Sequence, residues 1–193
     1  MLNCDDQNNN KSFSNLIAAK LLESRTIMIY GEINQDVARD VSEKILILSN
    51  ESKEKIKIYI NSQGGHVEAG DTIHDMIRSV EPMIDIIGTG WVASAGALIY
   101  SAPPKEQRFC LPNTRFMLHQ PSGGVGGTAT DIGIEAEQIV KMRERLNNIF
   151  AERTGQPYDR VAKDCDRNYW MTAQEAVDYG LAGKIISKLD ELK

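Results

Sequence analysis

The chain has 193 residues, enough for one domain with a sizeable core. Apolar residues make up 41% and charged residues 25%, as in an ordinary globular protein, and the net charge of −5 excludes a basic face for nucleic acid. The three cysteines, Cys4, Cys110 and Cys165, are too widely spaced for a metal site or a disulfide framework, which fits a reducing compartment such as the cytoplasm.

The sequence indicates neither a secretory signal nor a membrane-spanning segment. The first ten residues lack the basic and apolar regions of a secretory signal. One uncharged run, residues 86–104, is as long as a membrane span, but its glycines, its serines and its final Pro-Pro favour a buried strand, turn and helix. We therefore expect no membrane partner.

Strands and helices alternate along the chain, which argues for one α/β domain over residues 12–193 with a largely parallel sheet, after a mobile segment at 1–11. Helices are predicted at 12–23, from Asn34 to Leu48, after Gly65 to Val80, after Ser94, at 131–154, at 158–167 and from the capping box at Thr172 to Gly180. Strands are predicted at 26–30, 56–60, 83–88, 108–111, 115–118 and 185–187, with a tight turn at 61–65. The helix at 131–154 is about 36 Å long, so part of it is expected to project.

Ser94 is the first residue that suggests chemistry. It lies among small and apolar residues, between a strand-like run and an Ala/Gly-rich helical segment. A sharp strand-to-helix turn exposes a hydroxyl and offers a backbone N–H beside it, as a serine nucleophile requires. The spacing is Gly-x-x-x-Ser-x-Gly rather than Gly-x-Ser-x-Gly, so this segment alone fits a buried helix start with a capping serine equally well.

His119 is the histidine that stands where an apolar strand opens into a loop. His66 and His74 lie on one predicted helix and are interpreted as ordinary solvated or satisfied residues. Ser94 and His119 together form a candidate nucleophile–base pair. The group that orients the histidine is sought in residues 164–168, for which a charged helix end is the alternative interpretation.

Two glycine-rich stretches complete the candidate site. The pair Gly64-Gly65 lets a backbone N–H point into a site without obstruction, which suits half of an oxyanion hole. The extended loop at 122–127 is suited to pair edge-on with a substrate strand through main-chain hydrogen bonds. A plain flexible linker is the alternative for that loop.

Four strings of the chain resemble the proteolytic subunits of the Clp protease family, in that family's order and spacing, over about Ser24 to Ile186. They are Asn61-Ser-Gln-Gly-Gly, Gly90-x-x-Ala-Ser94-x-Gly, Met117-Leu-His119-Gln-Pro and Thr172 to Leu181. The resemblance implies a crotonase-like α/β fold of repeated ββα and βα units with a projecting handle helix. It also implies a serine endopeptidase that cleaves unfolded polypeptides inside two stacked heptameric rings. An AAA+ ATPase partner uses the ATP, and this subunit needs no cofactor or metal.

The resemblance also assigns roles to individual residues. It implies Ser94 as nucleophile, His119 as general base, and the N–H groups of Gly65 and Ala95 as the oxyanion hole. It implies that the helix from Asp131 interdigitates between rings. The substrate strand would bind along Ser122, Gly123, Gly124, Val125, Gly126 and Gly127.

The chain departs from the family where the triad acid is expected. The family's usual string ends Asp-Arg-Asp, whereas this chain has Asp166-Arg167-Asn168. An asparagine carbonyl accepts the histidine N–H but cannot stabilise an imidazolium by charge. We therefore predict a triad Ser94–His119–Asn168 that is weak alone and works best in a particle mixed with a paralogue that carries the full triad. Whether the particle is homomeric or mixed stays open. Two alternatives stay open: a chiefly structural or regulatory subunit of such a mixed particle, and a crotonase-type acyl-CoA enzyme.

Overall fold

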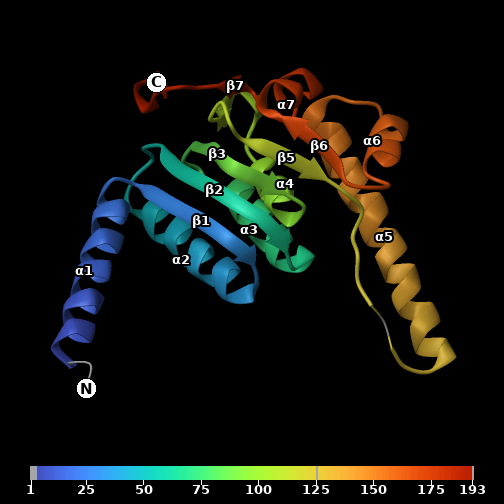
Figure 1. The fold of residues 1–193 in the computed structure, drawn as a ribbon, viewed down its shortest axis with the longest axis horizontal. Helices are drawn as coiled ribbons and strands as arrows, with labels where there is room; N and C mark the ends of the chain where they lie inside the picture. Colours follow the sequence, from blue (N-terminus) through green and yellow to red (C-terminus); the bar gives the residue numbers. More distant parts are fainter. Residues whose placement is uncertain (1–3, 125, 193) are drawn as a thin grey trace.

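The computed structural model describes residues 4–124 and 126–192, and its centre is one sheet of seven strands (Figure 1). The strand order is β1-β2-β3-β4-β7, while β5 pairs with β3 and β6 pairs with β5. Every pairing is parallel except that between β5 and β6. The strands are β1 (Thr26–Ile33), β2 (Ile56–Gly65), β3 (Ile84–Ala93), β4 (Arg108–Cys110), β5 (Arg115–Leu118), β6 (Tyr169–Thr172) and β7 (Lys184–Ile185).

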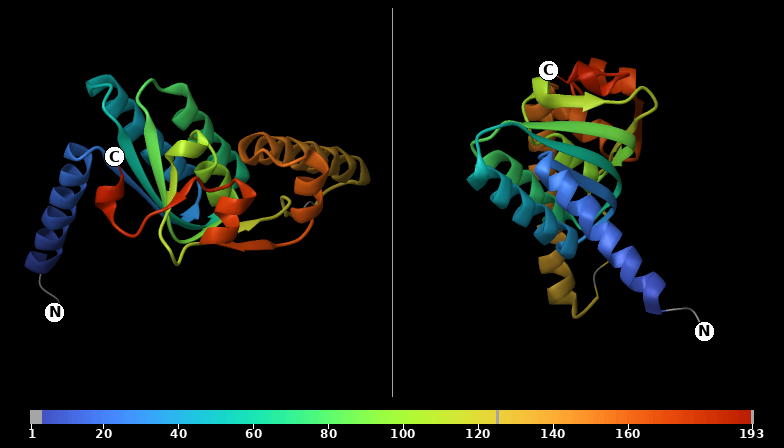
Figure 2. Two further views of the ribbon diagram at one scale, coloured as in Figure 1. Left: turned by 90° about the horizontal axis from the view of Figure 1, so that it is seen from above. Right: turned by 90° about the vertical axis from the view of Figure 1, so that its left-hand side faces the viewer.

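Helices α2 and α3 lie against one face of this sheet, while α1 and the outer part of α5 extend away from the body on opposite sides (Figures 1 and 2). The helices are α1 (Cys4–Glu23), α2 (Gln35–Glu51), α3 (Val67–Ser79), α4 (Ala95–Tyr100), α5 (Ala129–Thr154), α6 (Tyr158–Asp164) and α7 (Ala173–Tyr179), with 3-10 turns η1 (Lys105–Gln107) and η2 (Leu189–Glu191). No helix within 4–124 and 126–192 combines the length and the apolarity needed to cross a membrane.

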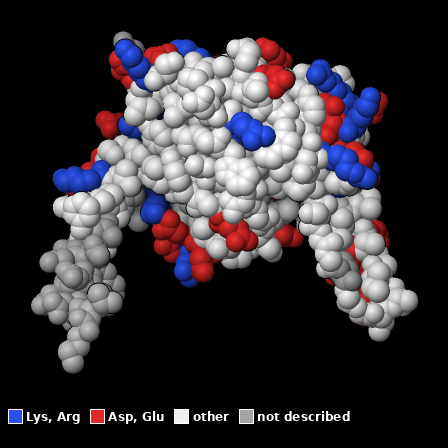
Figure 3. All heavy atoms as spheres, viewed as in Figure 1, with Lys and Arg blue, Asp and Glu red and all other residues white. Residues whose placement is uncertain are grey.

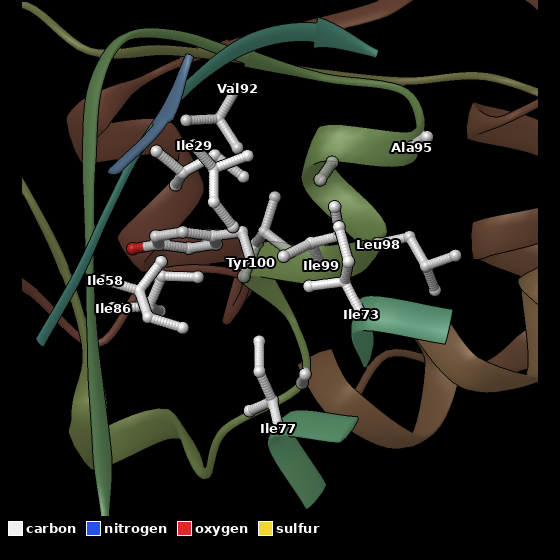
Figure 4. Packing of buried hydrophobic residues seen from close by; sticks show 14 of the residues in the cluster. Ile29, Ile58, Ile73, Ile77, Ile86, Val92, Ala95, Leu98, Ile99 and Tyr100 are labelled. Carbon is white, nitrogen blue, oxygen red and sulfur yellow. The ribbon is translucent and has the colours of Figure 1, made fainter. Parts of the chain in front are cut away.

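The core lies between the sheet and helices α2, α3 and α4. Every second residue of β2 from Ile56 to Ile60 is fully buried, as the predicted strand alternation requires. Tyr100 of α4 fills the space between Ile58, Ile86 and Ile99 (Figure 4). Its hydroxyl donates to the carbonyl of Phe109 at 2.8 Å, so the buried phenol is satisfied, and burial raises its pKa. This packing fixes α4, and with it the residue that precedes α4.

Strand β3 determines where the candidate site forms. Its first half, Ile86–Gly88, pairs with β4, and its second half, Trp91–Ala93, pairs with β5. The sheet therefore divides along β3, and α4 begins directly after β3 ends. The carboxyl ends of β3 and β5 lie side by side, which is where open α/β sheets place their ligands.

Helix α5 projects, as its length predicts. Leu146 and Phe150 near its end are buried, whereas Ile132, Ile134 and Val140 are 44%, 54% and 51% exposed. The buried end is braced because the Arg145 guanidinium donates to both carboxylate oxygens of Asp71 on α3, at 2.6 and 2.7 Å. The outer half of the helix therefore exposes these three apolar side chains to solvent.

Several predicted boundaries are wrong. Residues 61–65, predicted as a tight turn, continue β2 after a register shift, because they pair with β1 and β3 on either side. Strand β6 was not predicted at all, and α6 ends at Asp164 rather than at 167. Helix α1 begins at Cys4 instead of residue 12, so residues 4–11 are helical, while residues 1–3 lie outside the described residues. The mobility predicted for residues 1–11 stays a prediction.

Candidate active site

Ser94 lies in a strained turn between β3 and α4. Its backbone has φ 56° and ψ −123°, a conformation that costs a non-glycine residue about 1–3 kcal/mol. The turn is held from both sides: the Ser94 N–H donates to the carbonyl of Met117 at 2.9 Å, and its own carbonyl accepts from Ala97 and Leu98. Such strain persists only where the surroundings impose it, and it aims the hydroxyl out of the sheet end.

Gly64 supports this turn from behind. A Cβ placed on Gly64 would lie 2.5 Å from the Cβ of Ser94 and 2.9 Å from the carbonyl oxygen of Ala93. Gly64 also has φ +100°, and its N–H donates to the Ser62 hydroxyl at 3.0 Å. Only glycine fits this contact. The sequence marked the glycine pair as a backbone donor but did not indicate that Gly64 packs against Ser94.

Replacing Gly64 by alanine is therefore expected to displace Ser94 and lower kcat about 100-fold, because a shift near 1 Å at a reacting group has that effect. The measurement is steady-state hydrolysis of a fluorogenic peptide. Gly31→Ala is the matched control, because Gly31 also has a positive φ, of +82°, but a Cβ there meets nothing within 4 Å, and it should leave kcat unchanged. Equal rates for the two variants would show that the contact does not position Ser94.

His119 follows β5 and reaches Ser94. Its Nε2 lies 2.6 Å from the Ser94 Oγ, within hydrogen-bond reach. The parallel pairing of Ala93 with Met117 brings the two strand ends together and so creates this contact. Burial lowers the pKa of His119, so the imidazole is neutral at pH 7 and ready to accept a proton at Nε2 when Nδ1 carries the hydrogen. The catalytic roles of both residues stay predictions.

The lowered pKa of His119 has a kinetic consequence. A general base is active when deprotonated, so kcat/KM is expected to rise with pH through an apparent pKa below the usual histidine value of about 6.5, and to be level by pH 7.5. A pH–rate profile measures this limb. His66→Gln removes the exposed histidine of the neighbouring groove and should leave the limb in place. A limb centred above pH 7 would contradict the assignment.

Asn168 lies next to His119 in the sheet but is not bonded to it. The antiparallel pairing of β5 with β6 ends at Leu118 and Tyr169, and one further step places Asn168 opposite His119. Residues directly opposite in such a ladder have Cα atoms about 4.5–5.5 Å apart. The Asn168 side chain is exposed, and the hydrogen bonds of the described residues include none between it and His119. Its role as orienter stays a prediction.

Asp166, the nearest carboxylate in the sequence, is engaged elsewhere. Its side chain accepts from the Arg167 guanidinium at 3.2 Å, and its backbone carbonyl accepts from the Gln120 side chain at 2.8 Å. The Gln120 N–H in turn donates to the carbonyl of Cys165. These contacts tie residues 165–166 to the residue after His119 without bringing a carboxylate to the imidazole.

The two expected oxyanion donors flank Ser94. Ala95 follows it directly as the first residue of α4, and Gly65 follows the glycine that packs against it. Gly65 has φ +151° and faces the backbone of Ile33 so closely that a Cβ would collide with the Ile33 carbonyl. These close contacts require glycine at both positions of the pair. Donation by Gly65 and Ala95 to an oxyanion stays a prediction.

A small apolar pocket, with a volume of about 20 Å³, opens beside the Ser94–His119 pair. Its other lining residues are Val67, Ala95, Leu98, Pro121, Leu146 and Phe150. They come from α3, α4, the loop after β5 and α5, which no pattern in the linear sequence could bring together. A side chain that enters this pocket is expected to be apolar.

A larger groove of about 490 Å³ lies next to that pocket and shares Val67 and Pro121 with it. Of the loop predicted to bind substrate, Ser122, Gly123 and Gly124 line this groove, and Gly126 and Gly127 do not. Val125 lies outside the described residues. Because the groove adjoins the pocket, an extended peptide bound in it would bring one side chain to the pocket, and substrate binding by the loop stays a prediction.

The two cysteines whose side chains the structure describes offer no second nucleophile beside this pair. Cys110 and Cys165 are buried free thiols, and burial raises the pKa of each to about 12, so both are protonated at neutral pH. Within residues 4–124 and 126–192, no group of three or more His, Cys, Asp or Glu side chains is placed to hold a metal ion.

Comparison with known proteins gives consistent matches. The family model described as Clp protease matches residues 8–189. The chain is 58% identical to the ATP-dependent Clp protease proteolytic subunit 2 of Gluconobacter oxydans, covering 97% of this chain and 86% of that protein. It is 55% identical to proteolytic subunit 3 of Rhizobium meliloti, over the full length of both.

Solved structures agree with these sequences. ClpP1 from Listeria monocytogenes is 54% identical, with a TM-score of 0.84 over 92% of this chain and 99% of that one. An Asn-to-Asp mutant of the same protein gives a TM-score of 0.86 at the same identity and coverage. The α/β fold with a projecting handle helix that the resemblance implied is therefore confirmed.

Proposed function

The chain belongs to the Clp protease family and is one of its proteolytic subunits, and we propose that it cleaves peptide bonds with Ser94 as nucleophile and His119 as general base. The observation that carries this assignment is the 2.6 Å contact between the Ser94 Oγ and the His119 Nε2, made at a strained turn beside an apolar pocket. Nucleophile and base within hydrogen-bond reach are the signature of acyl transfer by serine.

The reaction follows from this geometry. His119 takes the Ser94 proton at Nε2 as the Oγ attacks the peptide carbonyl, and the N–H groups of Gly65 and Ala95 stabilise the oxyanion. His119 then gives the proton to the leaving amine, and water releases the acyl group by the reverse steps. Asn168 accepts the His119 Nδ1–H and so selects the tautomer whose Nε2 is free to act as base.

The substrate is an extended, unfolded polypeptide. Its backbone pairs with the loop at 122–127 through main-chain hydrogen bonds, which read no particular sequence. The side chain next to the scissile bond enters the pocket lined by Leu98, Leu146 and Phe150, so an apolar residue is preferred there.

The subunit acts within an assembly. The exposed apolar side chains of α5, Ile132, Ile134 and Val140, are suited to burial between two heptameric rings. An AAA+ Clp ATPase unfolds and feeds the substrates and uses the ATP, so this subunit itself needs no cofactor. The particle contains copies of this chain alone or includes a paralogue, and the free thiols of Cys110 and Cys165 support a reducing compartment such as the cytoplasm.

The two alternatives are not favoured. The relatives are named proteolytic subunits, which argues against a chiefly structural or regulatory role even though Asn168 occupies the acid's position. A crotonase-type acyl-CoA enzyme would need acidic catalysts, whereas the pocket beside Ser94 contains a serine–histidine pair and no carboxylate.

Hydrolysis of a short fluorogenic peptide by the purified chain tests the proposed function, because a short peptide enters the chamber without an ATPase. Activity that is absent from Ser94→Ala supports it. The same assay on Asn168→Asp distinguishes an active site that is weak for lack of a carboxylate from a chain that has no active site. No hydrolysis above the Ser94→Ala background in either protein would contradict the proposal.

A further inference from the structure

Trp91 and Trp170 are the only tryptophans in the chain, and they stack on one another. Their ring centroids are 6.4 Å apart and the ring planes differ by 9°. The guanidinium of Arg115 lies 4.4 Å from the centroid of the Trp170 ring, so a cation–π contact joins a third side chain to the stack. Three side chains from three different strands thus form one ordered cluster.

The cluster lies within a few residues of the catalytic residues along the same strands. Trp91 is on β3, three residues before Ser94, and pairs with Arg115 of β5. Trp170 is on β6, opposite Met117, and two residues after Asn168. Side chains two residues apart on a strand share a face, so Trp170 lies on the same side of the ladder as Asn168, and Arg115 on the same side as His119.

Strand β6 is held by few other contacts within the sheet. It has four residues, its one partner in the described sheet is β5, and it directly follows Asn168. The tryptophan stack links β6 to β3, across the intervening β5, and so joins the strand that delivers Ser94 to the strand that follows Asn168. The two rings keep this contact although 43% and 38% of their residues' surface is exposed. The face of the molecule seen in Figure 3 carries few charges near its centre, with most charged side chains at its edge.

We propose that the Trp91–Trp170 stack is a positioning element of the active site, which holds Asn168 opposite His119. The proposal rests on the proposed function, since it assigns a role to residues that act through the Ser94–His119 pair. Trp91 and Trp170 do not touch the reacting atoms; they fix the segment that carries the orienter.

Because residue 168 is an asparagine, catalysis is expected to depend on how well the stack positions it. A neutral amide forms a weaker hydrogen bond to the imidazole than a carboxylate does, because charge-assisted bonds are roughly twice as strong. A carboxylate can draw the histidine into place by its charge, whereas an amide must already stand at the right position. The activity of the natural chain is therefore expected to be more sensitive to loss of the stack than that of an Asn168→Asp variant.

The test compares Trp170→Ala with Trp170→Phe, each made in the natural chain and in Asn168→Asp. In the natural chain, Trp170→Ala is expected to lower kcat for a fluorogenic peptide roughly 10- to 100-fold while KM changes little. Trp170→Phe, which keeps a ring for stacking, should recover most of the loss. In the Asn168→Asp background the loss from Trp170→Ala should shrink to a few-fold. Tyr30→Ala is the matched control, because Tyr30 is an exposed ring that contacts Thr89 of the same sheet, and it should leave kcat unchanged.

The stack also has a signal independent of activity. Because the chain contains no other tryptophan, the long-wavelength indole bands of its near-ultraviolet circular dichroism come from Trp91 and Trp170, and exciton coupling between these bands reports the stack. The signal should be lost in Trp91→Phe as well as in Trp170→Phe, while sedimentation shows whether the particle is intact. If Trp170→Ala does not fold, Trp91→Leu provides the same comparison from the other ring.

The outcomes separate two failures. Unchanged kcat in Trp170→Ala and Trp91→Leu, or equal losses with Asn168 and with Asp at that position, would overturn the positioning role. Activity that survives Ser94→Ala would instead overturn the proposed function.

Discussion

Replacing Ser94 by alanine is expected to abolish peptide hydrolysis, lowering kcat about 10⁴-fold or more. The Ser94 hydroxyl is the group that His119 contacts at 2.6 Å, and without it the imidazole has no nucleophile to activate. Alanine fits the turn as well as serine does, because the side chain makes no capping hydrogen bond to α4. The fold and the assembly should therefore persist while activity is lost.

The matched control for Ser94→Ala is Ser79→Ala. The Ser79 hydroxyl donates to a backbone carbonyl on the exposed end of α3, so its removal changes composition in the same way without touching the site. The assay is hydrolysis of the fluorogenic peptide, with unfolding temperature measured in parallel. Activity retained by Ser94→Ala would require another nucleophile, and the buried thiols of Cys110 and Cys165 do not supply one at neutral pH.

Those parts of the fold that depend on local chemistry could be predicted from the sequence. Asn34 caps α2 through its side chain, which accepts from the Val37 N–H, and Thr172 forms the capping box that begins α7. The alternating isoleucines of β2 predicted a strand buried on one face. In each case the signal lies within a few residues, so no knowledge of the rest of the chain is needed.

Parts that depend on distant partners could not be predicted. Residues 61–65 have the composition of a turn, yet they extend β2 because β1 and β3 offer pairing partners. Strand β6 is too short to show a period, and it exists because β5 pairs with it. The alignment of Asn168 with His119 follows from that unpredicted pairing. The contact between Ser94 and His119 was expected from residue types, but the pocket beside them draws its residues from several elements at once.

Replacing Asn168 by aspartate is expected to raise kcat, by about 10²-fold and up to about 10⁴-fold, the cost of the opposite change in a serine protease. Continued one step beyond Leu118 and Tyr169, the register of β5 and β6 places residue 168 opposite His119, so we expect a carboxylate there to reach the imidazole by side-chain rotation alone. It would accept the Nδ1–H and stabilise the imidazolium that forms when Ser94 loses its proton. The amide of Asn168 can do only the first of these.

The same substitution is expected to move the pH profile. Burial lowers the pKa of His119 in the natural chain, whereas a neighbouring carboxylate favours the protonated imidazole and raises that pKa. The acid limb of kcat/KM should therefore shift to higher pH as kcat increases. Asn113→Asp is the matched control: it adds the same charge in the loop before β5, at the strand's other end, and should change neither quantity.

The two readouts together decide what Asn168 does. A higher kcat with a shifted limb means that the missing charge limits catalysis and that residue 168 contacts the imidazole. A shifted limb with unchanged kcat means that Asn168 already orients His119 well enough, so the natural triad is complete as it stands. If neither kcat nor the acid limb changes, residue 168 does not reach His119. The residue that orients the histidine would then have to lie outside the β5–β6 ladder.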